Sequence, residues 1–180
     1  MDGFRFLIAC SGEMQGGMKM TQGFLRILIA GVVLQIAAPA LFAADVPVPA
    51  TCTPQVNQKL AELIASQTTH SVDNVMVCGI TASASRTQHG GPHGDHEIFP
   101  LRVTMPDGNV RLVEVVSNNE LDGPLSSGPN TAVYAYGQAF FPTKGRFIAG
   151  VHDVHCATHR GADNGWIVVD GHKHPTTCSR

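Results

Sequence analysis

The side chains with the greatest capacity for chemistry fall in one short segment, residues 150–166, with the sequence GVHDVHCATHRGADNGW. This segment holds three histidines, one cysteine, two aspartates and the only tryptophan of the chain. Neutral imidazoles completed by a carboxylate are ligands that zinc and copper accept. His152, Asp153 and His155, together with His96 from an earlier segment, are therefore the candidate ligands for a divalent transition metal.

The spacing of His152 and His155 limits how they can act together. On a regular strand, residues three apart face opposite sides, so the two imidazoles converge only where the chain turns or bulges between them. Otherwise they bracket a strand end and bond to loop carbonyls. Without a metal, His96, His152, His155 and Trp166 are candidates for binding a ligand. Trp166 is expected either to fill the core or to stack on that ligand.

Catalysis without a metal has little support in the sequence. The motifs G-x-S-x-G, H-E-x-x-H, G-x-G-x-x-G and the Walker loop are all absent. Cys156 follows His155 directly, but adjacent residues seldom aim at each other and exported cysteines are usually oxidised. Two function classes remain open. One is a non-catalytic exported module that binds a small ligand or an extracytoplasmic protein, and the other is a metal-dependent hydrolase or nuclease that uses the histidine cluster.

The N-terminal region resembles an export signal. Residues 24–42, FLRILIAGVVLQIAAPALF, are almost wholly apolar, follow Lys19 and lead into small residues. This pattern is typical of a secretory signal peptide, here residues 18–43 with cleavage after Ala43. A membrane-spanning helix is the alternative, but the uninterrupted apolar part is at the short end of the roughly 17–25 residues that a span needs, and it contains Pro39.

The rest of the chain divides into simple parts. Residues 1–17 are expected to be a mis-called translation start, residues 44–52 an extended leader, and residues 53–180 a single domain that is periplasmic or secreted, with no stable membrane span after cleavage. Nine Lys or Arg and twelve Asp or Glu follow Ala43, which gives a net charge of −3. Nucleic-acid binders carry a basic stripe, so this composition disfavours nucleic acid as a partner.

Four cysteines lie in the mature part of the chain, and none is spaced C-x-x-C. An even count in an exported chain predicts two disulfides. An N-terminal helix that packs antiparallel on the first strand would bring Cys52 beside Cys78, and a turn near Gly171 would return Cys178 toward Cys156. We therefore predict Cys52–Cys78 and Cys156–Cys178, with a bridge between Cys52 and Cys178 as the alternative.

The scaffold is predicted to be mainly β. Thr53-Pro54 signals the start of a helix that reaches about Gln67, with apolar residues at helical spacing. Strand-like segments follow at residues 75–85, 96–105, 110–116, 132–141, 146–154 and 166–169, and residues 86–95 read as a loop. This order predicts a small five-stranded OB-like barrel with an N-terminal helix and a C-terminal hairpin. An open antiparallel α+β sheet is the alternative.

Several short motifs resemble a family of small exported bacterial domains of unknown function (number three-four-six-five). They are His96-Glu97-Ile98-Phe99, Asn118-Asn119, Tyr136-Gly137-Gln138, and His152-x-x-His155 ahead of Gly165-Trp166. The chain departs from the family pattern at four positions: Asn118 replaces a histidine, Gln138 a glutamate, Val154 a threonine and Cys156 a second histidine. The resemblance implies an exported β-rich domain with no established activity, and the departures remove candidate metal ligands or proton carriers.

Overall fold

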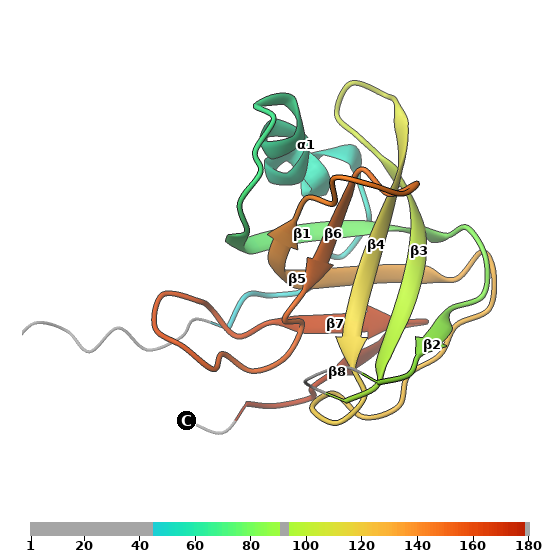
Figure 1. Ribbon diagram of the computed structural model, residues 1–180, viewed down its shortest axis with the longest axis vertical. Helices are drawn as coiled ribbons and strands as arrows, with labels where there is room; N and C mark the ends of the chain where they lie inside the picture. The colour runs from blue at the N-terminus through green and yellow to red at the C-terminus, as the bar shows by residue number, and fades with distance from the viewer. Residues whose placement is uncertain (1–44, 91–93, 179–180) are drawn as a thin grey trace, which may run out of the picture. The chain divides into compact units, whose positions relative to one another are not determined.

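The structure is a computed structural model that describes residues 45–90 and 94–178 (Figure 1). The predicted translation start and signal peptide lie outside these described residues. The helical elements are η1 (Pro54–Asn57) and α1 (Gln58–Ala65). The strands are β1 (Val72–Thr81), β2 (Arg86–Gln88), β3 (His96–Thr104), β4 (Val110–Asn118), β5 (Ala132–Phe140), β6 (Ala149–His152), β7 (Trp166–Val169) and β8 (His172–His174).

Five of the strands close into a barrel. β1 pairs antiparallel with both β3 and β5, β3 pairs with β4, and β5 pairs with β6. The parallel pairing of β4 with β6 completes the ring in the order β1-β3-β4-β6-β5. The hairpin of β7 and β8 extends the sheet from β5. The predicted mainly β, five-stranded OB-like barrel with an N-terminal helix and a C-terminal hairpin is confirmed.

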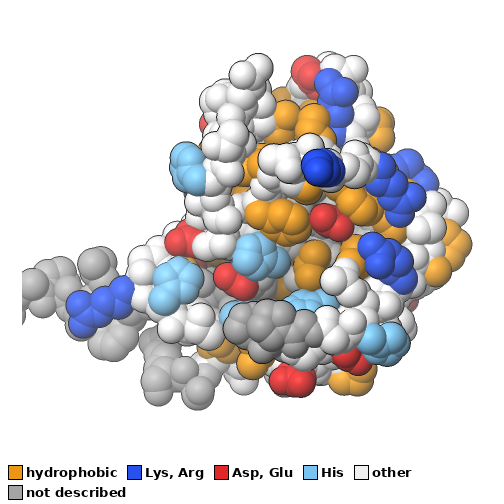
Figure 2. Space-filling view, viewed as in Figure 1, with side chains coloured by type: hydrophobic (Ala, Val, Ile, Leu, Met, Phe, Trp, Pro, Cys, Tyr) orange, Lys and Arg blue, Asp and Glu red, His pale blue; other side chains and the backbone are white. Residues whose placement is uncertain are grey.

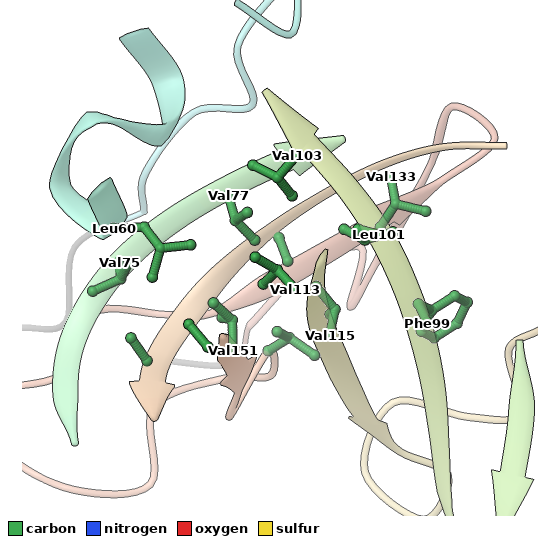
Figure 3. Packing of buried hydrophobic residues seen from close by; sticks show 14 of the residues in the cluster. Leu60, Val75, Val77, Phe99, Leu101, Val103, Val113, Val115, Val133 and Val151 are labelled. Carbon is green, nitrogen blue, oxygen red and sulfur yellow. The ribbon is translucent and has the colours of Figure 1, made fainter. Parts of the chain in front are cut away.

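Alternation along the strands builds the barrel core (Figure 3). The inward residues are mostly valine, which suits a strand by its β-branched shape and packs at high density in a narrow barrel. Fully buried examples are Val75, Val77, Val113, Val115 and Val151. Leu60 of α1 joins the same cluster, so the helix covers apolar surface of the barrel.

The first turn of the predicted helix is a 3₁₀ turn, followed by the α-helix. Pro54 starts it as predicted, although the Thr53 side chain makes no capping hydrogen bond. The buried Asn57 fixes this turn to the barrel, because its amide group donates to the carbonyls of Cys78 and Thr104 and accepts the backbone N–H of Cys78. An asparagine with this role could not be distinguished in the sequence from a surface polar residue.

Both disulfides pair as predicted, Cys52 with Cys78 and Cys156 with Cys178. The first lies where η1 meets β1, and Lys59, further along the helix, donates to the carbonyl of Asp73 at 3.0 Å. The helical segment therefore runs antiparallel to β1, as the prediction required. The alternative bridge between Cys52 and Cys178 is excluded.

Two local predictions need correction. Residues 86–88, expected to lie in a loop, form β2 and pair with the start of β3. The strand expected over residues 146–154 is only β6, Ala149–His152. Residues 86–88 form a strand because they pair with backbone groups at the start of β3. β6 is short because its partner β5 ends at Phe140, opposite Gly150.

Candidate functional site

A backbone turn directly after β6 brings His152 and His155 to the same side of the barrel. His152 is the last residue of β6, and Asp153 adopts the left-handed conformation with φ of 54°. Aspartate tolerates that conformation better than most residues other than glycine. The chain therefore turns between His152 and His155, which is the arrangement that the two imidazoles need in order to converge.

The two histidines line a cavity of about 740 Å³ on the outside of the barrel. His96, the first residue of β3, also lines it, although more than fifty residues separate it from His152 in the chain. The cavity is lined by His96, Val116, Asn118, Leu121, Phe140, His152, Asp153, His155 and Thr158. Figure 2 shows histidine, acidic and hydrophobic side chains next to one another in the middle of this face.

Asp153 links the two histidines electrostatically. Its Oδ1 lies 2.9 Å from Nδ1 of His152 and 3.7 Å from Nε2 of His155. The hydrogen bond with His152, supported by the contact with His155, holds the pKa of the Asp153 carboxyl well below its ordinary value. The same carboxylate raises the pKa of His155 above its ordinary value, while partial burial opposes that rise.

A second carboxylate, Asp122, influences His155 from the loop after β4. Only 8 % of Asp122 is exposed, and it accepts hydrogen bonds from the Ser117 hydroxyl at 2.8 Å and the Asn118 N–H at 2.9 Å. Burial raises the pKa of Asp122, and these hydrogen bonds and the charge of His155 oppose the rise. This role of Asp122 could not be predicted, because residues 117–131 have the composition of an ordinary polar loop.

The apolar wall of the cavity depends on Phe140 and Gly150. The two residues face each other across β5 and β6, and a Cβ atom at position 150 would collide with the Phe140 ring. The ring therefore lies over the β6 backbone, and its edge meets the His152 imidazole with 5.2 Å between ring centroids. Glycine at this position thus sets the position of an aromatic wall and, through it, of a histidine.

A polar network holds the loop that carries His155 against β1 and β5. The Tyr136 hydroxyl donates to Asp163 at 2.8 Å, and the Asp163 N–H donates to the Asn74 side chain at 2.9 Å. Gln138 donates to Asp73 at 2.6 Å. Burial and the Asp163 carboxylate raise the pKa of the Tyr136 hydroxyl, which therefore stays protonated as a donor.

The Tyr136-Gly137-Gln138 motif acquires a physical meaning in this network. Tyr136 bonds directly to Asp163 of the loop. Gln138 bonds to Asp73 of β1, and Asp73 lies 3.4 Å from the His159 ring of the loop. A Cβ atom at Gly137 would collide with the carbonyl of His152, so glycine permits the close approach of the chain at the end of β6. Asp73, Asn74 and Asp163 belong to the same network, and no short motif in the sequence marked them.

Trp166 does not belong to the cavity, so the prediction that it binds ligand beside the histidines is not supported by its position. It is 1 % exposed and packs in a separate cluster with Tyr136 and Val168. Its indole N–H donates to the carbonyl of Val46 at 2.8 Å. Trp166 therefore fills a core and fixes the leader to the barrel.

The candidate metal ligands are close together, yet their arrangement differs from a metal centre. In residues 45–90 and 94–178, no group of three or more His, Cys, Asp or Glu side chains is placed to hold a metal ion. Asp153 is engaged with both imidazoles, and the Nδ1 atom of His155 is bonded to the Cys156 carbonyl at 2.9 Å. Disulfide formation removes Cys156 as a thiolate ligand.

The cavity therefore has an aliphatic and aromatic wall together with imidazole, amide and carboxylate groups. Its lining residues come from four separate segments of the chain. Such a lining is typical of small-molecule sites, in which a few polar groups orient a largely apolar ligand. Comparisons of the chain with models of protein families, with curated proteins and with solved structures found no match.

Proposed function

We propose that this protein is an exported binding domain that holds a small organic ligand in the histidine-lined cavity and is not itself an enzyme. The observation that carries the proposal is the convergence of His96, His152 and His155 on one cavity from distant parts of the sequence. Its volume, about 740 Å³, lies within the range of roughly 300–1,000 Å³ that is common for such sites.

The shape and chemistry of the wall support a ligand with an apolar body and a polar group. Val116, Leu121 and Phe140 supply apolar contact, and the three imidazoles with Asn118 supply hydrogen-bond donors and acceptors. The loop that closes one side is anchored by the Tyr136–Asp163 hydrogen bond and by the contact of His159 with Asp73 of β1 at 3.4 Å. This anchoring favours a preformed site, in which little ordering entropy is lost on binding.

The two disulfides support export. The protein is a β-barrel with two disulfides, which indicate an oxidising, extracytoplasmic environment. No helix in the described part of the chain is long and apolar enough to span a membrane. A periplasmic or secreted location, with a signal peptide over residues 18–43, and membership of the exported family that the motifs resemble are part of the proposal.

The cavity can be tested with the fluorescent probe 1-anilinonaphthalene-8-sulfonate, which has an aromatic body and a polar head. Val116→Phe fills part of the cavity, so the probe should bind at least about tenfold more weakly, a loss of about 1.4 kcal/mol. Val110→Phe is the matched control, because Val110 is an exposed valine on the same strand that does not line the cavity.

Near-ultraviolet circular dichroism should show that both variants keep native packing, because the probe also binds partly folded states. If the probe bound both variants as tightly as the unaltered protein, the cavity would not be its site and the proposal would lose its support.

A metal-dependent hydrolase or nuclease is the second candidate, favoured by the contacts of Asp153 with His152 and His155. A metal that binds the folded state raises the melting temperature. Under this alternative, the double variant His152→Ala, His155→Ala should lose any shift produced by added zinc or copper. The double variant His172→Ala, His174→Ala on β8 controls for adventitious binding, and an unchanged shift in the first variant would exclude the cavity as a metal site.

A further inference from the structure

The inner face of the barrel changes from apolar to polar at the end where β3 begins and β4 ends (Figure 1). Phe99 and Val115 form the last inward apolar pair there, and the same register places Glu97 opposite Ser117. Because side chains alternate along a strand, Glu97 and Ser117 point to the same side as Phe99 and Val115. Both are buried, and directly opposed residues have Cβ atoms roughly 4.5–5.5 Å apart.

The loop after β4 brings a second carboxylate to this place. The chain turns back after the strand, because the Asp122 N–H donates to the carbonyl of Asn118 at 2.8 Å. Oδ2 of Asp122 accepts the Ser117 hydroxyl, also at 2.8 Å. The Asp122 carboxylate therefore lies beside the inward side chain that is opposite Glu97. Glu97 and Asp122 are both buried, with 4 % and 8 % of their surface exposed.

The same loop holds buried oxygen atoms that lack a hydrogen-bond partner. In the described residues the buried side-chain oxygens of this kind are Oδ1 of Asn119, Oδ1 of Asp122 and Oγ of Ser127. The Asn119 N–H donates to the carbonyl of Asp95 at 2.9 Å, which continues the pairing of β3 with β4 and turns the Asn119 side chain to the inner side. Buried oxygens in native proteins are usually satisfied, so these atoms indicate a bound water or ion.

No cationic side chain forms an ion pair with either carboxylate. In residues 45–90 and 94–178 every ion pair joins a histidine to another aspartate, and none involves Glu97 or Asp122. The Glu97 carboxylate accepts only a neutral donor among these contacts, the Thr87 hydroxyl at 2.8 Å. Burial raises the pKa of Asp122, which means that its charged form is not fully compensated. Buried charges are stable in proteins when they are paired or coordinate a metal.

We propose that Glu97, Asn119 and Asp122 bind a calcium ion at this end of the barrel. Calcium takes roughly six to eight oxygen ligands from carboxylates, amides, carbonyls and waters, and two carboxylates balance its charge. Magnesium demands a stricter geometry and loses its waters reluctantly, and zinc and copper accept imidazole or thiolate more readily. This set of oxygen ligands therefore favours calcium.

The calcium site and the cavity use opposite sides of the same strands. His96, Val116 and Asn118 of the cavity alternate with Glu97, Ser117 and Asn119, so the two groups point away from each other. The bound ion fixes the loop after β4 to the barrel, and that loop supplies Leu121 to the cavity wall. The inference goes beyond the proposed function, because the ion is held by residues that do not line the cavity.

Calorimetric titration with calcium chloride tests this assignment on the full chain, after dialysis against a chelator. The unaltered protein should bind a single calcium ion. Asp122→Asn and Glu97→Gln should each raise the Kd at least about tenfold, because calcium affinity depends on the number of charged ligands and both substitutions keep the side-chain size. Glu120→Gln is the matched control, since it removes an exposed carboxylate from the same loop and should leave the Kd unchanged.

Thermal unfolding of the unaltered protein gives a measurement that does not depend on the variants. Calcium should raise the melting temperature, and magnesium at the same concentration should raise it less. Absence of calcium binding, tighter binding of magnesium, an equal loss of affinity in Glu120→Gln, or loss of calcium binding in the double variant His152→Ala, His155→Ala would each overturn the assignment. Probe binding in the cavity is measured separately, so failure here would leave the proposed function standing, and the reverse also holds.

Discussion

At the scale of single residues, the site depends on one carboxylate between two imidazoles. Asp153 accepts from His152 and contacts His155, and its left-handed backbone is what allows both contacts. Asp122 adds a second negative charge near His155 from another loop. The charge state of His155 is thus set by two residues that approach it from different segments of the chain.

Replacing Asp153 with asparagine tests this arrangement. Asparagine keeps the shape and tolerates the left-handed backbone, but it removes the charge that raises the pKa of His155. We expect the pKa of His155 in Asp153→Asn to fall below that in the unaltered protein. Titration of the imidazole C–H signals by NMR measures it, and the exposed His172 serves as an internal reference.

The same variant has a predictable effect on stability against pH. The folded-state pKa of Asp153 is lowered, so its contribution is present above its unfolded value of 3.8 and is lost as pH falls. The folded-state pKa of His155 is raised, so its contribution is present below 6.5 and is lost as pH rises through the folded value.

The unaltered protein should therefore exceed Asp153→Asn in unfolding free energy most between about pH 4 and 6.5. Because 41 % of the Asp153 side chain is exposed, solvent screens its charge, and the difference should be about 1 kcal/mol or less. Denaturant unfolding across this pH range measures it, and a difference that grew toward pH 8 would contradict the assigned contacts.

At the scale of elements, the cavity is a product of how β5 and β6 pair. Phe140 and Gly150 face each other across the two strands, and the ring fills the space that a side chain at position 150 would take. The β4–β6 pairing places Val116 and Asn118 on the same outer face. β6 ends at His152, so the loop that carries Asp153 and His155 begins directly after it.

Gly150→Ala should displace the Phe140 ring and with it the contact to His152. The ring end is movable, so we expect a moderate loss of stability, about 1–3 kcal/mol for an overpacked position, together with weaker probe binding. Gly128→Ala is the matched control, because an added Cβ there meets no neighbouring atom and the backbone φ is not positive. Equal effects of the two substitutions on probe binding would show that Phe140 does not shape the cavity.

At the scale of the whole molecule, the two disulfides stabilise different parts of the chain. Cys52–Cys78 fixes the helical segment to the barrel, and Cys156–Cys178 ties the loop of the site to the C-terminal segment. They close loops of similar length, with separations of 26 and 22 residues. The chain-entropy model therefore gives them similar contributions to stability, about 3 kcal/mol each.

Removing each disulfide separately should have similar effects on stability and different effects on the cavity. The variant Cys156→Ser, Cys178→Ser should weaken probe binding, because Cys156 follows His155 directly in the loop of the site. The variant Cys52→Ser, Cys78→Ser should lower the melting temperature by a similar amount while probe affinity is kept. Thermal unfolding and probe titration on both variants measure these effects, and equal losses of affinity would contradict the division of roles.

Much of the fold was predictable because local patterns and global packing agree. Alternating valines in β4 and the turn between β3 and β4 determine a hairpin, and the order of strands favoured a small barrel. The Cys52–Cys78 pairing followed from the lengths of a helix and a strand, which chain geometry fixes, and the Cys156–Cys178 pairing from the turn near Gly171. The convergence of His96 with His152 was only a hypothesis, because the sequence does not reveal which strands become neighbours.

What the sequence determined by itself, then, is the set of inward and outward residues, the disulfide pairs and the histidine-rich segment. Only the tertiary structure decided that Trp166 fills a separate core, that Asp122 influences His155, and that Tyr136 anchors the loop through Asp163. The physical reason is that periodicity is a property of a local segment, whereas a site is made by contacts between segments distant in the chain. Closure of the barrel through the parallel β4–β6 pairing is the step that brings those segments together.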